Sequence, residues 1–124
     1  MPDGRRRKVR MTLNPTTDEM VDAIAVFGRD LMMLENPALG ARAIPFATLL
    51  AEVNSWIASQ ESTVRGILCT QTRQVKPEII SGVSMAGLVS TAIRAHYGDK
   101  FPAGSCAACL VSYGLTKFCA GSTA

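Results

Sequence analysis

Residues 16–34 read TTDEMVDAIAVFGRDLMML, and their apolar side chains recur at the intervals of an α-helix. Thr16 and Glu19 have the spacing of a capping box, in which each side chain bonds a backbone N–H that the helix leaves free. Pro37 disfavours the helical conformation of Asn36. We therefore predict a first helix that starts after Thr16 and ends near Asn36. Its apolar face is spaced by 4, 3, 4 and 3 residues: Met20, Ile24, Phe27, Leu31 and Leu34.

A second apolar face follows Pro45, which suits a first helical turn because proline lacks the N–H that would have no partner there. The pattern predicts a helix that ends around residues 59–61. Residues 63–75 combine β-branched side chains with a weak helical pattern, and we predict a helical turn followed by a loop. The second face is spaced by 3, 4 and 3 residues: Phe46, Leu49, Val53 and Trp56.

Two later stretches also contain start and stop signals of helices. Pro77 opens the first of them, and Gly98 follows Tyr97 as a stop, because glycine readily adopts the conformation that ends helices. Ser105 is the predicted N-cap of the last helix, which extends to about Phe118.

Helices joined by short connections predict an all-α fold, with four to five helices in a bundle or an orthogonal array. A length of 124 residues suits one hydrophobic core. We expect a flexible basic arm over residues 1–15, a helical domain over 16–119 and a frayed tail over 120–124. No uncharged stretch reaches the roughly twenty residues of a membrane helix, so we expect no transmembrane segment and no membrane partner.

Positive charge is concentrated near the N-terminus. Residues 11–124 contain eight basic and nine acidic residues, a net charge of −1, whereas the whole chain carries +3. Arginine bonds phosphate in a bidentate way, and neutralised phosphates release counterions. We expect the arm to bind nucleic acid without sequence preference; an acidic protein or an anionic membrane surface is the alternative target. Five of the thirteen basic residues form this arm cluster: Arg5, Arg6, Arg7, Lys8 and Arg10.

Arg65, Arg73 and Lys76 form a second basic group, which would extend the phosphate-binding surface; an ordinary exposed loop is the alternative. No aromatic residue interleaves these charges, which argues against base stacking of the kind used by RRM and OB domains. The chain also lacks a helix-turn-helix pattern, so nothing in it indicates recognition of a particular sequence.

Gly82, Ala86 and Ser90 lie four residues apart in the helix predicted after Pro77. Small residues in such a row let another helix approach closely. The first two helices already supply apolar faces for the domain's own core. We therefore expect the small residues to contact a neighbouring subunit in a homo-oligomer.

Four cysteines occur in the chain: Cys69, Cys106, Cys109 and Cys119. Because no apolar export signal follows the basic start, we expect reduced thiols and a cytoplasmic or other reducing compartment. Cys106 and Cys109 have C-x-x-C spacing, which suits a zinc site or a redox pair. With no second C-x-x-C and no preceding strand, we expect apolar packing roles and no metal.

The sequence contains no evident catalytic constellation. His96, the single histidine, lies near a helix end without a partner nucleophile, and there is no glycine-rich phosphate loop. We expect no catalytic site, cofactor or small-molecule substrate. The pattern favours a non-enzymatic, self-associating structural protein of coat or nucleoid type, which contacts nucleic acid through its arm. The alternatives are a helical protein–protein adaptor or regulator, and a zinc- or thiol-dependent protein that uses Cys106 and Cys109.

Overall fold

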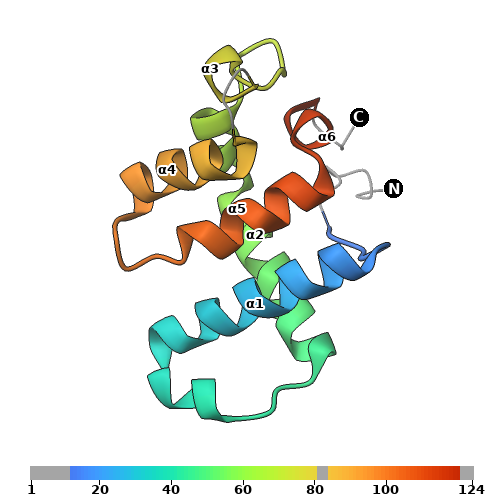
Figure 1. The fold of residues 1–124 in the computed structure, drawn as a ribbon, viewed down its shortest axis with the longest axis vertical. Helices are drawn as coiled ribbons and strands as arrows, with labels where there is room; N and C mark the ends of the chain where they lie inside the picture. The colour runs from blue at the N-terminus through green and yellow to red at the C-terminus, as the bar shows by residue number, and fades with distance from the viewer. Residues whose placement is uncertain (1–11, 81–83, 121–124) are drawn as a thin grey trace, which may run out of the picture.

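The computed structural model describes residues 12–80 and 84–120. Regular structure in these ranges is helical, apart from an isolated bridge that pairs Cys69 with Val75. The expected all-α fold is confirmed. No helix in the described ranges is both long enough and apolar enough to cross a membrane. In chain order the elements are α1 (Asp18–Glu35), the 3-10 helix η1 (Pro37–Ala41), α2 (Phe46–Leu68), α3 (Pro77–Ile80), α4 (Met85–Tyr97), α5 (Ala103–Tyr113) and α6 (Leu115–Ala120) (Figure 1).

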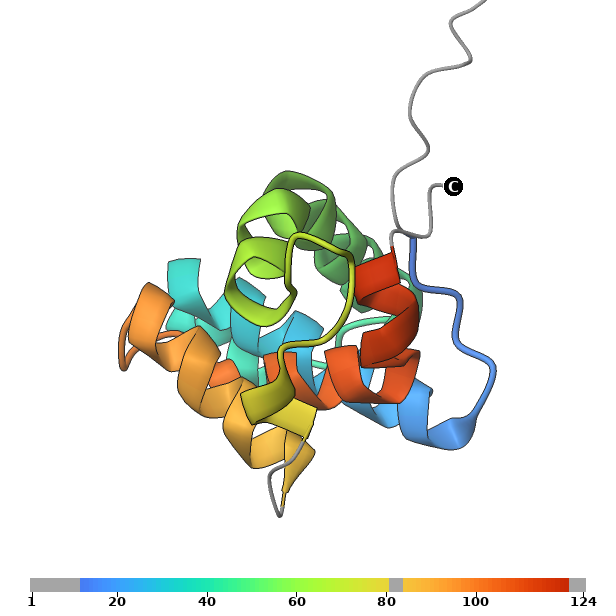
Figure 2. The same cartoon turned by 90° about the horizontal axis from the view of Figure 1, so that it is seen from above.

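The four longest helices form two layers. In Figure 1, α4, α5 and α1 lie side by side, and α2 crosses behind them. Figure 2 shows α2 on one side of the molecule and the other three helices on the opposite side. α5 is the middle helix of its layer and packs against both α1 and α4. The steep crossing of α2 corresponds to the orthogonal array and not to a bundle with nearly parallel axes.

The hydrophobic core lies between these layers. The Phe27 ring meets Trp56 edge-on, with centroids 5.3 Å apart, and Trp56 stacks on Phe101 at 5.4 Å. Burying an apolar side chain stabilises the fold by roughly 1.5–3 kcal/mol, so the two predicted apolar faces supply much of the driving force. Most of their residues are buried, as the spacing predicts: Met20, Ile24, Phe27, Leu31, Leu49 and Val53.

The first helix begins one residue later than predicted. Thr17 is the N-cap, because its backbone is extended (φ −138°, ψ 160°) and its Oγ1 accepts the Met20 N–H at 3.1 Å. The Thr16 hydroxyl lies 3.6 Å from the Met20 sulfur instead. The two adjacent threonines have the same capping chemistry, so the sequence pattern does not distinguish them.

The second helix is longer than predicted and continues to Leu68. Residues 63–68 of the helical turn and loop expected over 63–75 are therefore helix, and a short turn follows. Val64 and Leu68 extend the buried face of α2 and are almost completely inaccessible to solvent. Their burial outweighs the weaker helix propensity of β-branched Thr63 and Val64, which costs only a few tenths of a kcal/mol per residue.

The helix predicted from Pro77 to Tyr97 is divided into α3 and α4. Ser84 is not helical (φ −128°, ψ 105°), and its Oγ accepts the Gly87 N–H at 3.1 Å. A serine competes for backbone hydrogen bonds in this way, which makes it a better cap than a helix interior residue. The predicted stop at Gly98 is confirmed, with φ at 99°.

The last predicted helix is also divided. α5 begins at Ala103, so Ser105 lies inside its first turn and is not the N-cap. Its hydroxyl bonds Asp30 Oδ2 of α1 at 2.9 Å. α5 ends at Tyr113 because Gly114 has a positive φ of 112°, which reorients the chain into α6.

A disulfide joins Cys69, after α2, to Cys119 of α6, with the Cα atoms 5.5 Å apart. The expectation of reduced thiols is wrong for this pair. The two cysteines are 50 residues apart. Closing a loop of that length lowers the conformational entropy of the unfolded chain, which stabilises the folded state by about 4 kcal/mol. Sequence spacing does not reveal the pair, because it forms only when α6 folds back onto α2.

Candidate functional site

The arm cluster lies outside the described residues, which begin at Thr12. It consists of Arg5, Arg6, Arg7, Lys8 and Arg10. Leu13 is fully buried, although it belongs to the stretch that the sequence assigns to the arm. Its N–H donates to Asn54 Oδ1 at 2.7 Å, and its carbonyl oxygen accepts from Asn54 Nδ2 at 3.4 Å. The fold therefore holds the chain from Leu13 onward, immediately after the basic cluster.

Arg65, expected in the second basic group, makes its contacts within the fold. Its Nε donates to the Phe118 carbonyl oxygen at 3.1 Å, and its guanidinium carbon lies 5.4 Å from the centre of the Phe118 ring. A terminal nitrogen of the same guanidinium lies 2.6 Å from Glu61 Oε2. The contacts with Phe118 join α2 to α6 beside the disulfide, and the contact with Glu61 lies within α2, so the guanidinium has a structural role.

Arg73 and Lys76 lie in and after the turn that follows α2. Arg73 is exposed and has a positive φ of 64°, while Lys76 is half-buried. The turn is closed by the Thr70 N–H, which donates to the Gln74 carbonyl oxygen at 2.7 Å. The structure thus places the three members of the predicted group near one end of α2, with the Arg65 guanidinium bound to α6.

The predicted subunit-contact row is not continuous along one helix. Ala86 and Ser90 lie one turn apart on α4, and Gly82 lies outside the described residues. Non-helical Ser84 separates Gly82 from the other two in sequence. Ala86 is exposed and Ser90 is half-buried.

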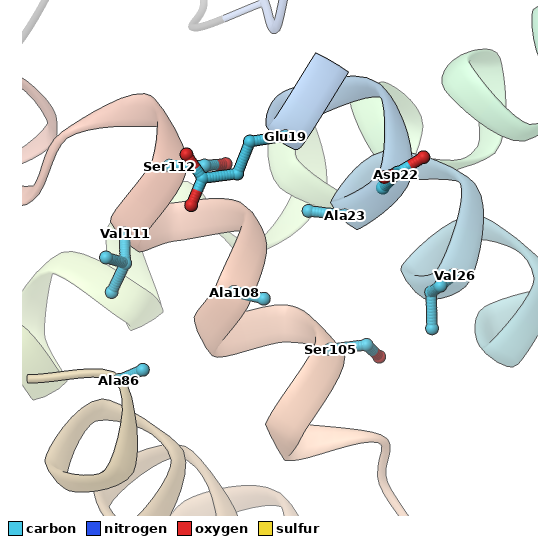
Figure 3. A pocket seen from close by; sticks show the side chains of 9 residues that line it. All are labelled: Glu19, Asp22, Ala23, Val26, Ala86, Ser105, Ala108, Val111 and Ser112. Carbon is cyan, nitrogen blue, oxygen red and sulfur yellow. The ribbon is translucent and has the colours of Figure 1, made fainter. Parts of the chain in front are cut away.

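Ala86 lines a groove of about 390 Å³, which we call the α5 groove. Figure 3 shows α5 between α1 and α4, with Ser105 and Ala108 directed towards the α1 side. Small residues on this face of α5 leave its surface lower than that of its two neighbours. The lining comes from α1 (Glu19, Asp22, Ala23 and Val26), α4 (Ala86) and α5 (Ser105, Ala108, Val111 and Ser112).

Sequence reasoning missed this groove, although a signal for it exists. Ser105, Ala108 and Ser112 are spaced by 3 and 4 residues, and they form the same kind of small-residue face as the row that includes Ala86. The spacing shows that a helix has a shallow face. Only the arrangement of α1 and α4 on either side of α5 shows that this face is open to solvent.

The rim of the α5 groove is acidic on the α1 side. Glu19 and Asp22 are exposed, and neither forms an ion pair with a described cation. Asp30, further along α1, is tied to the groove through its bond with Ser105. α1 contains five acidic residues and one arginine, and two of the acidic residues, Glu19 and Asp22, line the groove.

Large apolar side chains of α1 and α4 are exposed, and one of them lines the groove. Val26, in the α1 wall, is 53% exposed, and Met85, next to Ala86, is 36% exposed. An apolar groove with exposed apolar edges and a charged rim is typical of a surface that binds another chain.

A second hollow, of about 260 Å³, adjoins the first. Its lining includes Thr12, where the described chain begins, and Met20 of α1. Ser112 lines both hollows, so the start of the fold and the α5 groove lie on one continuous stretch of surface.

The Cys106 and Cys109 side chains are buried in α5. Burial raises the pKa of the Cys109 thiol to about 12 and that of Cys106 further, the latter with a smaller contribution from Cys109. Redox and metal chemistry need the thiolate, which these surroundings disfavour. Within the described ranges, no three His, Cys, Asp or Glu residues are grouped closely enough to hold a metal ion. His96 is exposed in the last turn of α4.

No protein-family model, curated protein or solved structure matches this chain.

Proposed function

We propose that this protein is a non-enzymatic, self-associating structural protein that contacts nucleic acid through its basic arm, in the manner of a coat or nucleoid protein. The observation that carries the proposal is the separation of the positively charged arm from a nearly neutral domain. Five basic residues occupy positions 5–10, whereas residues 11–124 carry a net charge of −1. The fold holds the chain from Leu13 onward, so the basic cluster lies just before the N-terminal boundary of the anchored domain.

The separation of charge also predicts how the protein would lie on the polymer. Arginines of the arm neutralise phosphates and release counterions, which gives binding that depends on salt and not on sequence. The acidic wall formed by α1 would be repelled by the same phosphates. The arm would therefore contact the nucleic acid while the domain projects outward and remains available to neighbouring subunits.

Self-association is supported by the exposed apolar surface around Ala86. Val26 lines the groove on the wall opposite Ala86, Met85 precedes Ala86 on α4, and a monomer gains nothing from leaving these exposed apolar side chains in water. A net charge of −1 for residues 11–124 opposes assembly only weakly.

The α5 groove also favours the second candidate, a helical adaptor whose groove takes a segment of another protein. Recognition of that kind uses an apolar groove with a few polar groups at its rim, which Glu19 and Asp22 would supply. The two candidates differ in whether the arm binds nucleic acid.

The test of nucleic-acid binding compares two triple variants with the same loss of charge. Arg5→Gln, Arg6→Gln and Arg7→Gln alter the arm, and Arg42→Gln, Arg94→Gln and Lys100→Gln alter exposed positions of the domain. Anisotropy of labelled random-sequence DNA and RNA, titrated at several salt concentrations, gives affinity and salt slope. We expect the arm variant alone to lose about two to three units of slope and at least about tenfold in affinity. Equal losses in both variants would contradict the proposal.

The test of assembly replaces Ala86 with Leu, and Ala47, exposed on α2, with Leu as control. Light scattering measures the particle mass, and circular dichroism monitors folding in the same sample. We expect Ala86→Leu to lower the mass while the thermal transition stays unchanged, because added bulk blocks a neighbour. An unchanged particle mass in Ala86→Leu would place the subunit contact elsewhere.

A further inference from the structure

We propose that the α5 groove is the resting site of the protein's own basic arm, which lies along the acidic α1 wall when no nucleic acid is bound. The groove has the shape for an extended segment. Its floor is made of the small side chains Ser105, Ala108 and Ser112, and Val26 and Ala86 provide apolar walls. Arginine suits such a surface because its aliphatic stem packs on apolar atoms while its guanidinium reaches a charged rim.

The charges of the groove and the arm are complementary. The arm carries five positive charges in six residues. α1 carries five acidic residues and a single arginine, and its Glu19 and Asp22 line the groove. Figure 3 shows the Glu19 side chain extending from α1 towards α5, across the end of the groove that includes Ser112. Because no described cation pairs with Glu19 or Asp22, both carboxylates are available to the arm.

The arm is attached at the right place to reach this site. Thr12 lines the second hollow, which shares Ser112 with the α5 groove. An extended chain advances about 3.3–3.6 Å per residue, so the seven steps from Thr12 back to Arg5 span roughly 25 Å. The floor from Ser105 to Ser112 extends over about 10 Å of helix axis. The basic cluster can therefore cover the groove without opening the fold.

Attachment also favours the chain's own arm over that of a second copy. A segment joined by a short linker has an effective concentration of roughly millimolar at a nearby site. The arm of another molecule is present only at the concentration of the protein. The intramolecular contact therefore dominates in dilute solution.

Docking of the arm would couple the two parts of the proposed function. Nucleic acid and the groove would compete for the same arginines, so phosphate binding would withdraw the arm and uncover Val26 and Ala86 for assembly. This consequence rests on the proposed function, whereas the docking itself does not.

The docking test is limited trypsin digestion of the full-length, nuclease-treated protein, with mass spectrometry to follow cleavage after the arm's Arg and Lys residues. Glu19→Gln with Asp22→Asn removes the acidic rim. Glu78→Gln with Asp99→Asn removes two exposed carboxylates outside the groove lining and is the matched control. We expect cleavage to become about fivefold faster in the rim variant only, because two exposed ion pairs are lost.

A second variant makes the result independent of the charge change on α1. Ala108 is exposed on the floor of the groove, so Ala108→Lys should fold normally while it fills and repels the site. It should accelerate cleavage as much as the rim variant does, and salt at about 0.5 M should do the same to the parent protein. Thermal transitions of all variants confirm folding.

Three results would overturn the docking proposal. They are equal cleavage rates in rim and control variants, no effect of Ala108→Lys, and protection that disappears on about hundredfold dilution, which would assign the groove to a second copy. Since the assay contains no nucleic acid, its failure leaves the nucleic-acid proposal standing. Equal losses of nucleic-acid binding in the arm variant and its control would contradict the nucleic-acid proposal and would equally leave the docking proposal standing.

Discussion

The side-chain amide of Asn54 holds the backbone of Leu13 at both of its polar atoms, 41 residues away along the chain. Leu13 is fully buried, and the amide satisfies the N–H and the carbonyl oxygen that its burial removes from water. This contact marks the point at which the arm leaves the domain.

Replacement of Asn54 by Ala should lower the free energy of unfolding by about 1–3 kcal/mol, because a buried backbone N–H loses its acceptor. Asn54→Asp keeps an acceptor oxygen at the site of the 2.7 Å bond and should cost less. Urea unfolding measures both. Equal stability of Asn54→Ala and the parent protein would show that Leu13 is not anchored by this amide.

Two glycines should respond to the same substitution with opposite signs. A Cβ on Gly28 would lie 2.7 Å from the Leu49 carbonyl oxygen, so Gly28→Ala must push α1 away from α2, at about 1–3 kcal/mol. A Cβ on Gly66 would meet nothing within 4 Å, and Gly66→Ala should stabilise α2 by roughly 0.5–1 kcal/mol. Urea midpoints that move in the same direction would contradict the packing of α1 on α2.

Arg65 should affect stability more than nucleic-acid binding. Arg65→Lys keeps the charge but loses the Nε bond to Phe118, and should lower the free energy of unfolding by about 1 kcal/mol. Exposed Arg73→Gln should leave stability nearly unchanged. Unfolding curves and the anisotropy titration, run on both variants, separate the two roles. A parent-like stability combined with weaker binding in Arg65→Lys would assign Arg65 to the phosphate surface.

The buried thiols of Cys106 and Cys109 should make the fold sensitive to alkaline pH. Burial raises the pKa of Cys109 from 9.0 to about 12, and that of Cys106 still further, so the folded state binds these protons more tightly than the unfolded state. Stability is then fully present below about pH 9 and decreases as the pH rises towards 12. The variant Cys106→Ala with Cys109→Ala should show a shallower decline in thermal midpoint over this range. Parallel declines would mean that other groups cause the alkaline loss.

Sequence alone determined the features that depend on neighbouring residues. The 4-3-4-3 spacing in α1 and the 3-4-3 spacing after Pro45 specify helices with one apolar face, and burial of Phe27 and Val53 follows that periodicity. The stop at Gly98 needs only its freedom to adopt positive φ. The position of the basic cluster next to a nearly neutral domain is likewise a property of residue order.

The tertiary structure decided what depends on residues far apart in the chain. Continuation of α2 to Leu68 requires a core that buries Val64, and the pairing of Cys69 with Cys119 requires α6 to return to the end of α2. The hydrogen bond from Arg65 Nε to the Phe118 carbonyl oxygen likewise requires α6 to lie against α2. The α5 groove exists because α1 and α4 lie on either side of a helix with small side chains. Periodicity specifies which face of a helix is shallow, but the relative placement of three helices is set by packing over the whole core.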